Sequence, residues 1–309
     1  MENSQSFYSK VSGSKSVGEI DSGSVTRRFD KHASTYDSFA AVQKNMSFMC
    51  IDILQKLIKT HSFAPKSILE LGCGTGQLTS LLCSVFPSGK ITAIDAAPAM
   101  IGIASSKHLQ NATFELSNIE NFTSDQKYDL IVSSAAVQWL KNPKKELSDI
   151  HALLSDRSVC LHLTFGPKTF QEINFCIGSA DQANDDPAGK DVLHAGFPQN
   201  RITEKTVSQW YAALKNERLP HIEADSFICE MSYPDAAALF KSINRTGASY
   251  TTAGRLKAGR LMKAIRLYDT LYGTDSGVTA TYEIIRLIGS NYYRDLSVDR
   301  AETSSPYPL

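Results

Sequence analysis

The stretch Ser67-Ile68-Leu69-Glu70-Leu71-Gly72-Cys73-Gly74-Thr75-Gly76 decides the fold class of this chain. Its first five residues form a compact, mostly apolar run, which is typical of a buried strand. Three glycines follow at alternate positions, and the helical pattern of residues 77–85 comes directly after them. A glycine turn between a strand and a helix lets a cofactor approach the backbone without meeting a Cβ atom. The stretch therefore predicts a cofactor-binding turn within an α/β domain.

Strands and helices alternate along the chain around this turn. The expected strands cover 67–71, 90–95, 112–116, 128–133, 158–165, 226–233 and 280–288, and the expected helices 77–85, 97–109, 142–154, 234–247 and 255–272. Such alternation produces βαβ units and a mostly parallel sheet, so the sequence predicts a Rossmann-like sheet of seven strands. Apolar residues at helical intervals over 27–58 predict an N-terminal helical cover.

Composition sets the expected domain boundaries. Residues 1–25 are rich in Ser and Gly and predict a disordered segment, and residues 297–309 predict a flexible tail. Between them, 26–296 is expected to form one domain. Within it, residues 166–225 mix helical patterns with polar, turn-rich sequence, and we expect an inserted helical lid there.

Charge and composition exclude several functional classes. Lys plus Arg and Asp plus Glu number 32 each, so the chain generates no strong basic field for generic nucleic-acid binding. No apolar run approaches the roughly 20 residues that span a bilayer. Six cysteines without a CxxC pair predict free thiols, and seven histidines without HxxH or HExxH spacing predict no catalytic metal. We expect a cytoplasmic monomer that binds neither nucleic acid nor membrane.

The spacing of the glycines narrows the choice of cofactor. Dinucleotide sites use GxGxxG and rest a phosphate on the helix N-terminus. The tighter Gly72-x-Gly74-x-Gly76 spacing, with Glu70 ahead of it, favours S-adenosyl-L-methionine, which has no pyrophosphate and carries an ammonium group. Glu70 could meet that ammonium directly or through water. Asp95, at the end of the second expected strand, could accept hydrogen bonds from both ribose hydroxyls. A structural glycine turn or an NAD site is the alternative.

Two later strand ends are expected to complete the cofactor site. Ser117-Asn118-Ile119-Glu120 resembles the Gly-Asp-Ala-Glu segment of class I methyltransferases, whose second residue contacts the adenine amino group. Asn118 could still accept that amino hydrogen through its amide oxygen, and a solvent-exposed turn is the alternative. The segment 133–136 is expected beside the methionine part. The cofactor-binding residues expected on these grounds are Tyr36, Gln43, Glu70, Gly72, Cys73, Gly74, Gly76, Asp95, Ala96, Asn118, Ile119 and Ser134.

Four further segments carry more specific patterns: RFDKHASTYD at 28–37, AAVQWL at 135–140, LTFGPKTFQE at 163–172 and GVTATYE at 277–283. Together they resemble the malonyl-acyl-carrier-protein O-methyltransferases of biotin synthesis, over most of residues 26–289. The resemblance implies the class I methyltransferase sheet as the fold. The sequence departs from the family pattern at Asn118, where an Asp is usual, and over the expected lid, which matches poorly.

The resemblance also implies a reaction. The substrate would be the free carboxylate of a malonyl thioester on acyl carrier protein or coenzyme A. The products would be the methyl ester of that carboxylate and S-adenosyl-L-homocysteine. Masking this charge would let the acyl group enter fatty-acid elongation as a primer. The alternatives are methylation of another small carboxylic acid or a quinone-like acceptor, and a cofactor-binding assembly factor without catalytic activity.

Methyl transfer to a carboxylate needs few catalytic groups. A carboxylate has a pKa near 4, so it is ionised at neutral pH and needs no general base. Tyr36 is a candidate for lining the site and capping the cofactor or the substrate carboxylate, although it could equally pack the N-terminal helix. Phe197 is a candidate for shaping the acyl pocket. The residues expected near the substrate are Gln138, Trp139, Phe170, Arg201 and Arg245, where the two arginines could orient the carboxylate or be surface charges.

The helix expected at 255–272 carries a second type of signal. Leu261, Ile265 and Tyr268 share one face, whereas Arg260, Lys263 and Arg266 lie on another; these three are the partner residues expected to dock an acidic acyl carrier protein. A solvated helix face is the alternative.

Overall fold

The computed structural model describes residues 22–182, 205–247, 258–294 and 296. Its centre is one sheet in which seven strands, the number that the sequence predicts, follow the order β3-β2-β1-β4-β5-β8-β6, and the short β7 pairs with β8 beside this path. The strands are β1 Ser67–Leu71, β2 Lys90–Asp95, β3 Ala112–Leu116, β4 Tyr128–Ser134, β5 Leu154–Phe165, β6 His221–Tyr233, β7 Gly273–Thr274 and β8 Gly277–Ser290. Strands β1 to β5 are parallel, and β8 runs antiparallel to β5 and β6.

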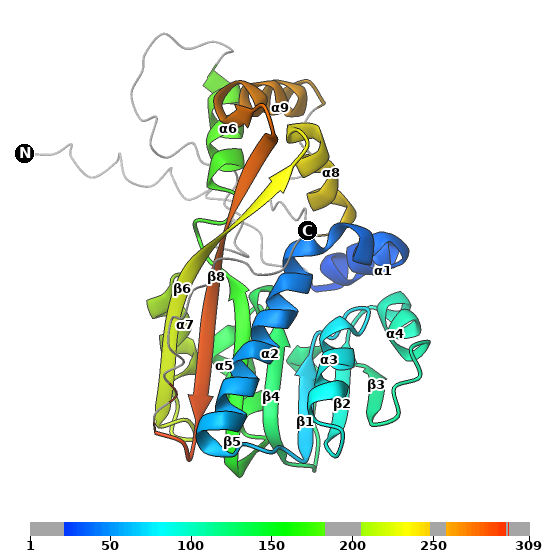
Figure 1. Ribbon diagram of the computed structural model, residues 1–309, viewed down its shortest axis with the longest axis vertical. Helices are drawn as coiled ribbons and strands as arrows, with labels where there is room; N and C mark the ends of the chain where they lie inside the picture. The colour runs from blue at the N-terminus through cyan, green and yellow to red at the C-terminus, as the bar shows by residue number, and fades with distance from the viewer. Residues whose placement is uncertain (1–21, 183–204, 248–257, 295, 297–309) are drawn as a thin grey trace, which may run out of the picture.

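Helices cover both faces of the sheet (Figure 1). They are α1 Ser22–Phe39, α2 Ala41–His61, α3 Gln77–Val85, α4 Pro98–Ser105, α5 Pro143–His151, α6 Gln171–Gln182, α7 Val207–Leu214, α8 Ala236–Arg245 and α9 Ala258–Tyr272, with 3₁₀ turns at Ile119–Asn121 and Val137–Trp139. In β1, Ile68 belongs to the core under α2 and α3, whereas Leu69 and Leu71 belong to the core under α5 and α7. This alternation explains why the strand is apolar on both faces.

The N-terminal cover begins earlier than the sequence predicts and consists of two helices. Residues 22–25, expected to be disordered, form the first turn of α1, and Val25 is buried against Phe29 and Trp139. Ala40 separates α1 from α2 within the single expected range. The Ser- and Gly-rich composition concealed this start because only Val25 in the first turn contributes apolar burial.

The second half of the expected lid belongs to the core of the fold. Helix α7 packs on α5 and β6, and Trp210 and Leu214 are fully buried there. Strand β6 begins at His221, inside the range expected for the lid, so the boundary at 225 is wrong. The sequence of this strand is polar because β6 lies at the edge of the sheet. Asp225 on this strand is stabilised there by a bidentate ion pair with Arg286, with N···O distances of 2.8 and 2.9 Å. Phe197 and Arg201 lie outside the described residues.

Strands β6 and β8 extend far beyond their neighbours. They have 13 and 14 residues, whereas β1 has five, and their extended ends carry α6, α8 and α9 (Figure 1). Tyr268 of α9 is fully buried and donates a hydrogen bond to the Thr279 carbonyl at 2.9 Å. These elements form a cap beyond the carboxyl ends of the parallel strands, the edge where α/β sheets bind ligands.

One buried polar cluster lies in the core between α5 and β5. The Nε2 atoms of His151 and His162 are 3.0 Å apart, and their rings stack. Potential metal-ligand atoms of these histidines and Cys160 lie within 4.8 Å of one another, a grouping that the sequence spacing did not predict. Because the two rings hydrogen-bond to each other, the cluster has a structural explanation as a neutral histidine pair. Burial lowers the pKa of both imidazoles, that of His162 to about 4.

All six cysteines are free thiols, as predicted. Among the helices that the structure describes, none has the length and apolar character needed to cross a bilayer.

Candidate active site

The glycine turn has the backbone geometry that a ligand cradle needs. Gly72, Gly74 and Gly76 all have positive φ, at 69°, 55° and 79°, where a side chain is strained. A Cβ atom on Gly72 would lie 2.3 Å from the Cβ of Ala136, so the packing leaves no room for a side chain at this position. A Cβ on Gly74 would meet nothing within 4 Å and would enter the pocket beside the turn. Gly74 therefore keeps space open for a ligand.

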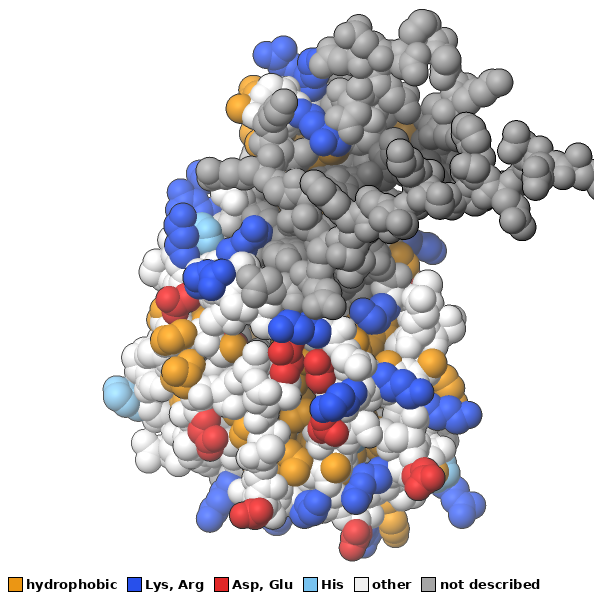
Figure 2. All heavy atoms as spheres, turned by 180° about the vertical axis from the view of Figure 1, so that it is seen from behind, with side chains coloured by type: hydrophobic (Ala, Val, Ile, Leu, Met, Phe, Trp, Pro, Cys, Tyr) orange, Lys and Arg blue, Asp and Glu red, His pale blue; other side chains and the backbone are white. Residues whose placement is uncertain are grey.

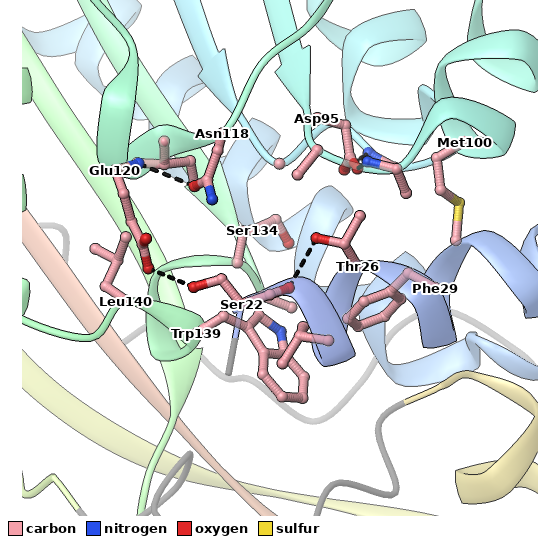
Figure 3. Close-up of a pocket in the computed structure, with 18 of the residues that line it drawn as sticks. Ser22, Thr26, Phe29, Asp95, Met100, Asn118, Glu120, Ser134, Trp139 and Leu140 are labelled. Atoms are coloured by element: carbon pink, nitrogen blue, oxygen red, sulfur yellow. Dashed lines mark hydrogen bonds between the residues drawn. The ribbon is translucent and has the colours of Figure 1, made fainter. Parts of the chain in front are cut away.

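Asp95 stands at the end of β2 and faces this pocket (Figure 3). Its Oδ2 accepts a hydrogen bond from the Gly74 N–H at 2.9 Å, and its Oδ1 accepts one from the Ala97 N–H at 2.8 Å. Burial raises the pKa of this carboxyl, and the backbone hydrogen bonds oppose that shift. Each carboxylate oxygen can accept a second hydrogen bond, so the group fits two neighbouring hydroxyls of a ribose.

The first pocket encloses about 780 Å³ of space when its open mouth is included. Of the cofactor-binding residues expected from the sequence, it is lined by Tyr36, Gly72, Gly74, Asp95, Ala96, Asn118, Ile119 and Ser134. Its roof is formed by one face of α1, with Ser22, Val25, Thr26 and Phe29 at helical spacing (Figure 3). The sequence reasoning missed this roof because it placed the first of these residues in a disordered segment.

Glu70, Cys73 and Gly76, which were also expected at the cofactor, do not line the first pocket. Glu70 is buried, and its burial raises the pKa of the carboxyl to about 8. A cation bound in front of the turn would favour the ionised form of this group. Of the two routes expected for its interaction with the ammonium group, the position of Glu70 suits the one through water.

Asn118 joins the pocket to the roof helix. Its Oδ1 accepts a hydrogen bond from the Glu120 N–H at 3.0 Å and caps the 3₁₀ turn. Because an amide oxygen has two lone pairs, it can still accept an adenine amino hydrogen. The carboxylate of Glu120 accepts a hydrogen bond from the Ser22 hydroxyl at 2.8 Å and so ties the start of α1 over the pocket (Figure 3).

A second pocket adjoins the first and encloses about 590 Å³ including its mouth. The two share Phe29, Tyr36, Ala135 and Trp139 as lining residues. The second pocket is otherwise lined by Phe39, Val42, Gln43, Gln138, Phe165, Thr169, Phe170, Ser242, Ile243, Thr246 and Tyr282. Gln43, expected at the cofactor, thus lies in this neighbouring pocket instead. Gln138, Trp139 and Phe170, which the sequence analysis expects near the substrate, also line this second pocket.

Backbone strain is concentrated in the wall of the second pocket. Ala135 and Phe170 have positive φ values of 55° and 61°, which cost non-glycine residues on the order of 1–3 kcal/mol and are frequent at functional sites. The amide of buried Gln138 donates to the Ala135 carbonyl at 2.8 Å and accepts from the Thr164 hydroxyl at 3.0 Å. Gln138 therefore holds the strained turn, in addition to lining the pocket.

The sequence reasoning missed Tyr282, which lines the second pocket from β8. Its hydroxyl lies 2.9 Å from that of Tyr233, and its ring contacts Phe170 with centroids 4.8 Å apart. Burial raises the pKa of Tyr282, so its hydroxyl stays protonated at neutral pH. Tyr282 lies within segment 277–283, one of the four that carry the family resemblance, and this resemblance was the sequence signal that could have identified it as a site residue.

Among the charged residues expected near the substrate, those that the structure describes line neither pocket. Arg245 is exposed at the end of α8, so its expected role of holding a carboxylate inside the pocket is not supported. On α9, Ile265 and Tyr268 pack inward, whereas Lys263 and Arg266 are exposed and Arg260 is half-buried. The amphipathic pattern of this helix is confirmed, but α9 contributes no residue to the second pocket.

This sheet, with a ligand cradle at its carboxyl edge, defines a methyltransferase domain. Residues 42–231 match the family described as a methyltransferase domain, and the chain belongs to that family. It is 34% identical to malonyl-[acyl-carrier protein] O-methyltransferase of Anoxybacillus flavithermus, over 86% of this chain and 96% of that protein. It is 30% identical to the protein of the same name in Priestia megaterium, over 84% and 94%. The chain belongs to the malonyl-[acyl-carrier protein] O-methyltransferase family.

A solved structure shows the same fold at lower similarity. The YcgJ protein from Bacillus subtilis superimposes with a TM-score of 0.51 at 17% identity, over 77% of this chain and 97% of that one.

Proposed function

We propose that this protein transfers a methyl group from S-adenosylmethionine to the free carboxylate of a malonyl thioester carried on acyl carrier protein. One observation carries the proposal: the pocket that contains Asp95, the expected ribose acceptor, adjoins a second pocket through shared walls at Tyr36 and Ala135. A donor and an acceptor bound in these two pockets would meet at that junction. The near full-length similarity to the named relatives supports the choice of acceptor.

The acceptor carboxylate is already a nucleophile. With a pKa near 4 it is ionised at neutral pH, and no general base is required. S-adenosylmethionine supplies a methyl group on a positively charged sulfur. The carboxylate oxygen attacks the methyl carbon in line as the carbon–sulfur bond breaks, and the bonding electrons stay on sulfur. The protein contributes alignment of the two groups and removal of water from the carboxylate.

Aromatic and hydroxyl side chains at the junction fit these tasks. Phe29 and Trp139 pack edge to face with centroids 5.4 Å apart and form a dry wall shared by both pockets. Tyr36 lies in the same shared wall, and burial raises the pKa of its hydroxyl. It therefore stays protonated at neutral pH and can donate a hydrogen bond to the acceptor. A neutral donor orients a carboxylate without the tight ion pair that would weaken its attack.

The product would be an uncharged methyl ester at the end of the acyl group. Loss of the charge would let fatty-acid elongation enzymes use it as a primer, an early step toward the pimeloyl group of biotin. Coenzyme A is an alternative carrier of the same malonyl thioester.

The test is a methyl-transfer assay with labelled S-adenosylmethionine and malonyl-acyl carrier protein, with free malonate as the control. Label on the protein-bound thioester, released as a methyl ester, is the expected result. Label on malonate but not on the thioester would favour a small-acid methyltransferase. Label on neither, despite measurable cofactor binding, would favour an assembly factor.

Replacing Tyr282 by Phe is expected to lower kcat/KM for the malonyl thioester about 3- to 10-fold, the scale of one hydrogen bond. The affinity for S-adenosylmethionine should stay unchanged because Tyr282 does not line the first pocket. Tyr292→Phe, which alters a half-exposed tyrosine, is the matched control. Equal losses for the two variants, or weaker cofactor binding by Tyr282→Phe, would contradict a role at the acceptor.

A further inference from the structure

The second pocket lies between two helices that each contribute part of its wall. Helix α1 supplies Phe29 and Phe39, and helix α8 supplies Ser242 and Ile243. The helices pack against each other, and Gly247, after α8, lies close to the backbone of Arg28. Helices α1 and α8 therefore form one side of the second pocket.

The outer surfaces of these two helices are basic. Lys31 on α1 and Lys241 and Arg245 on α8 are exposed. His32, which follows Lys31 on α1, is half-buried, and its burial together with the nearby charges of Lys31 and Arg245 lowers its pKa. Figure 2 shows lysine and arginine side chains gathered around a histidine on the edge of the molecule where these helices lie. We call Lys31, His32, Lys241 and Arg245 the basic rim.

The acidic residues of the two helices do not neutralise the rim. Asp30 accepts a hydrogen bond from the Ala99 N–H at 2.7 Å and so faces α4. Asp37 accepts hydrogen bonds from the Thr75 hydroxyl at 2.6 Å and the Gln77 amide at 3.0 Å, on the side of the glycine turn. The sequence of α8 contains no Asp or Glu. The excess positive charge therefore stays on the outer side of the pocket.

We infer that the basic rim is the docking surface for the acidic carrier protein, positioned so that its thioester arm enters the second pocket between α1 and α8. This inference rests on the proposed function. Acyl carrier proteins are acidic, and complementary charges at the edge of an interface steer association and fix orientation. The rim is preferred over the basic face of α9 because α1 and α8 line the acceptor pocket and α9 does not.

The test compares two charge-reversal variants on two substrates. The rim variant carries Lys31→Glu, Lys241→Glu and Arg245→Glu, and the matched control carries Lys263→Glu and Arg266→Glu on α9. The substrates are malonyl-acyl carrier protein and malonyl-pantetheine, which has the same thioester without the carrier or its charges. We expect the rim variant to raise KM for the carrier substrate about tenfold or more, with little change in kcat or in activity on malonyl-pantetheine. The α9 variant should resemble the unaltered protein on both substrates.

Direct binding provides a readout that does not depend on turnover. Fluorescence anisotropy with labelled malonyl-acyl carrier protein should show weaker binding by the rim variant, and salt should weaken binding by the unaltered protein more than by this variant. Unchanged S-adenosylmethionine affinity and thermal unfolding would show that the rim variant is folded. Equal losses on both substrates, a loss confined to the α9 variant, or unchanged carrier binding would overturn the inference. Carrier binding at the rim without any methyl transfer would instead overturn the proposed function.

Discussion

Replacing Asp95 by Ala is expected to weaken S-adenosylmethionine binding by about 1.5–3 kcal/mol, or roughly 10- to 150-fold, the scale of hydrogen bonds to a charged group. The substitution removes the proposed acceptor for the ribose hydroxyls. It also leaves the Gly74 and Ala97 N–H groups without the carboxylate that holds the turn open. Titration calorimetry with S-adenosylmethionine and S-adenosylhomocysteine measures the effect.

Two further variants make this result specific. Asp95→Asn should also lose affinity, because its amide NH₂ must face either the Gly74 or the Ala97 N–H, and two donors cannot pair. Asp125→Ala removes an exposed carboxylate and should bind the cofactor like the unaltered protein. Full affinity in folded Asp95→Ala would show that another group holds the ribose.

The buried His151–His162 pair is expected to make the protein sensitive to acid. Both imidazoles have lowered pKa values in the folded state, whereas unfolded histidine titrates near 6.5. Between these values the unfolded chain binds more protons, so the free energy of unfolding falls as the pH drops below about 6.5. With a folded pKa of about 4, His162 alone would contribute a loss of about 3 kcal/mol by pH 4.

Urea unfolding across this pH range measures the effect against two variants. In His162→Gln the part of the acid sensitivity due to this ring should disappear, so its stability should converge with that of the unaltered protein as the pH falls. His108→Asn removes an exposed histidine at a positive φ of 49°, where Asn is well tolerated, and should keep the full pH dependence. A constant stability difference between His162→Gln and the unaltered protein at every pH would contradict the proposed linkage.

Local sequence signals predicted the cofactor half of the site because that half is built from strand ends. Gly72, Gly74 and Asp95 follow directly from β1 and β2, and parallel strands bring their carboxyl ends together. Strand boundaries such as those of β1, β2 and β3 were equally accessible, since apolar runs bounded by turn residues mark them. For these strands and the residues that follow them, the pattern of apolar and turn residues within a short stretch of sequence is sufficient for the prediction.

The acceptor half depends on contacts between distant segments, which local patterns do not encode. Tyr282 reaches the second pocket only because β8 turns back between β5 and β6. Glu70 is buried and does not line the first pocket, and its place in the motif does not distinguish such a position from direct contact with the cofactor. Strand β6 was predicted too short because it lies at the sheet edge, where the polar residues on one face weaken the apolar pattern by which a strand is recognised in the sequence.

The position of α1 has a consequence for the order of events in turnover. This helix roofs the first pocket and walls the second, and the Ser22–Glu120 hydrogen bond fastens its start. A cofactor in the first pocket would lie beneath this helix, and a movement of α1 at Phe29, which lines both pockets, would also open one side of the acceptor compartment. S-adenosylmethionine should therefore bind before the acceptor, and S-adenosylhomocysteine should leave after the methyl ester. Steady-state kinetics are then expected to follow an ordered sequential mechanism.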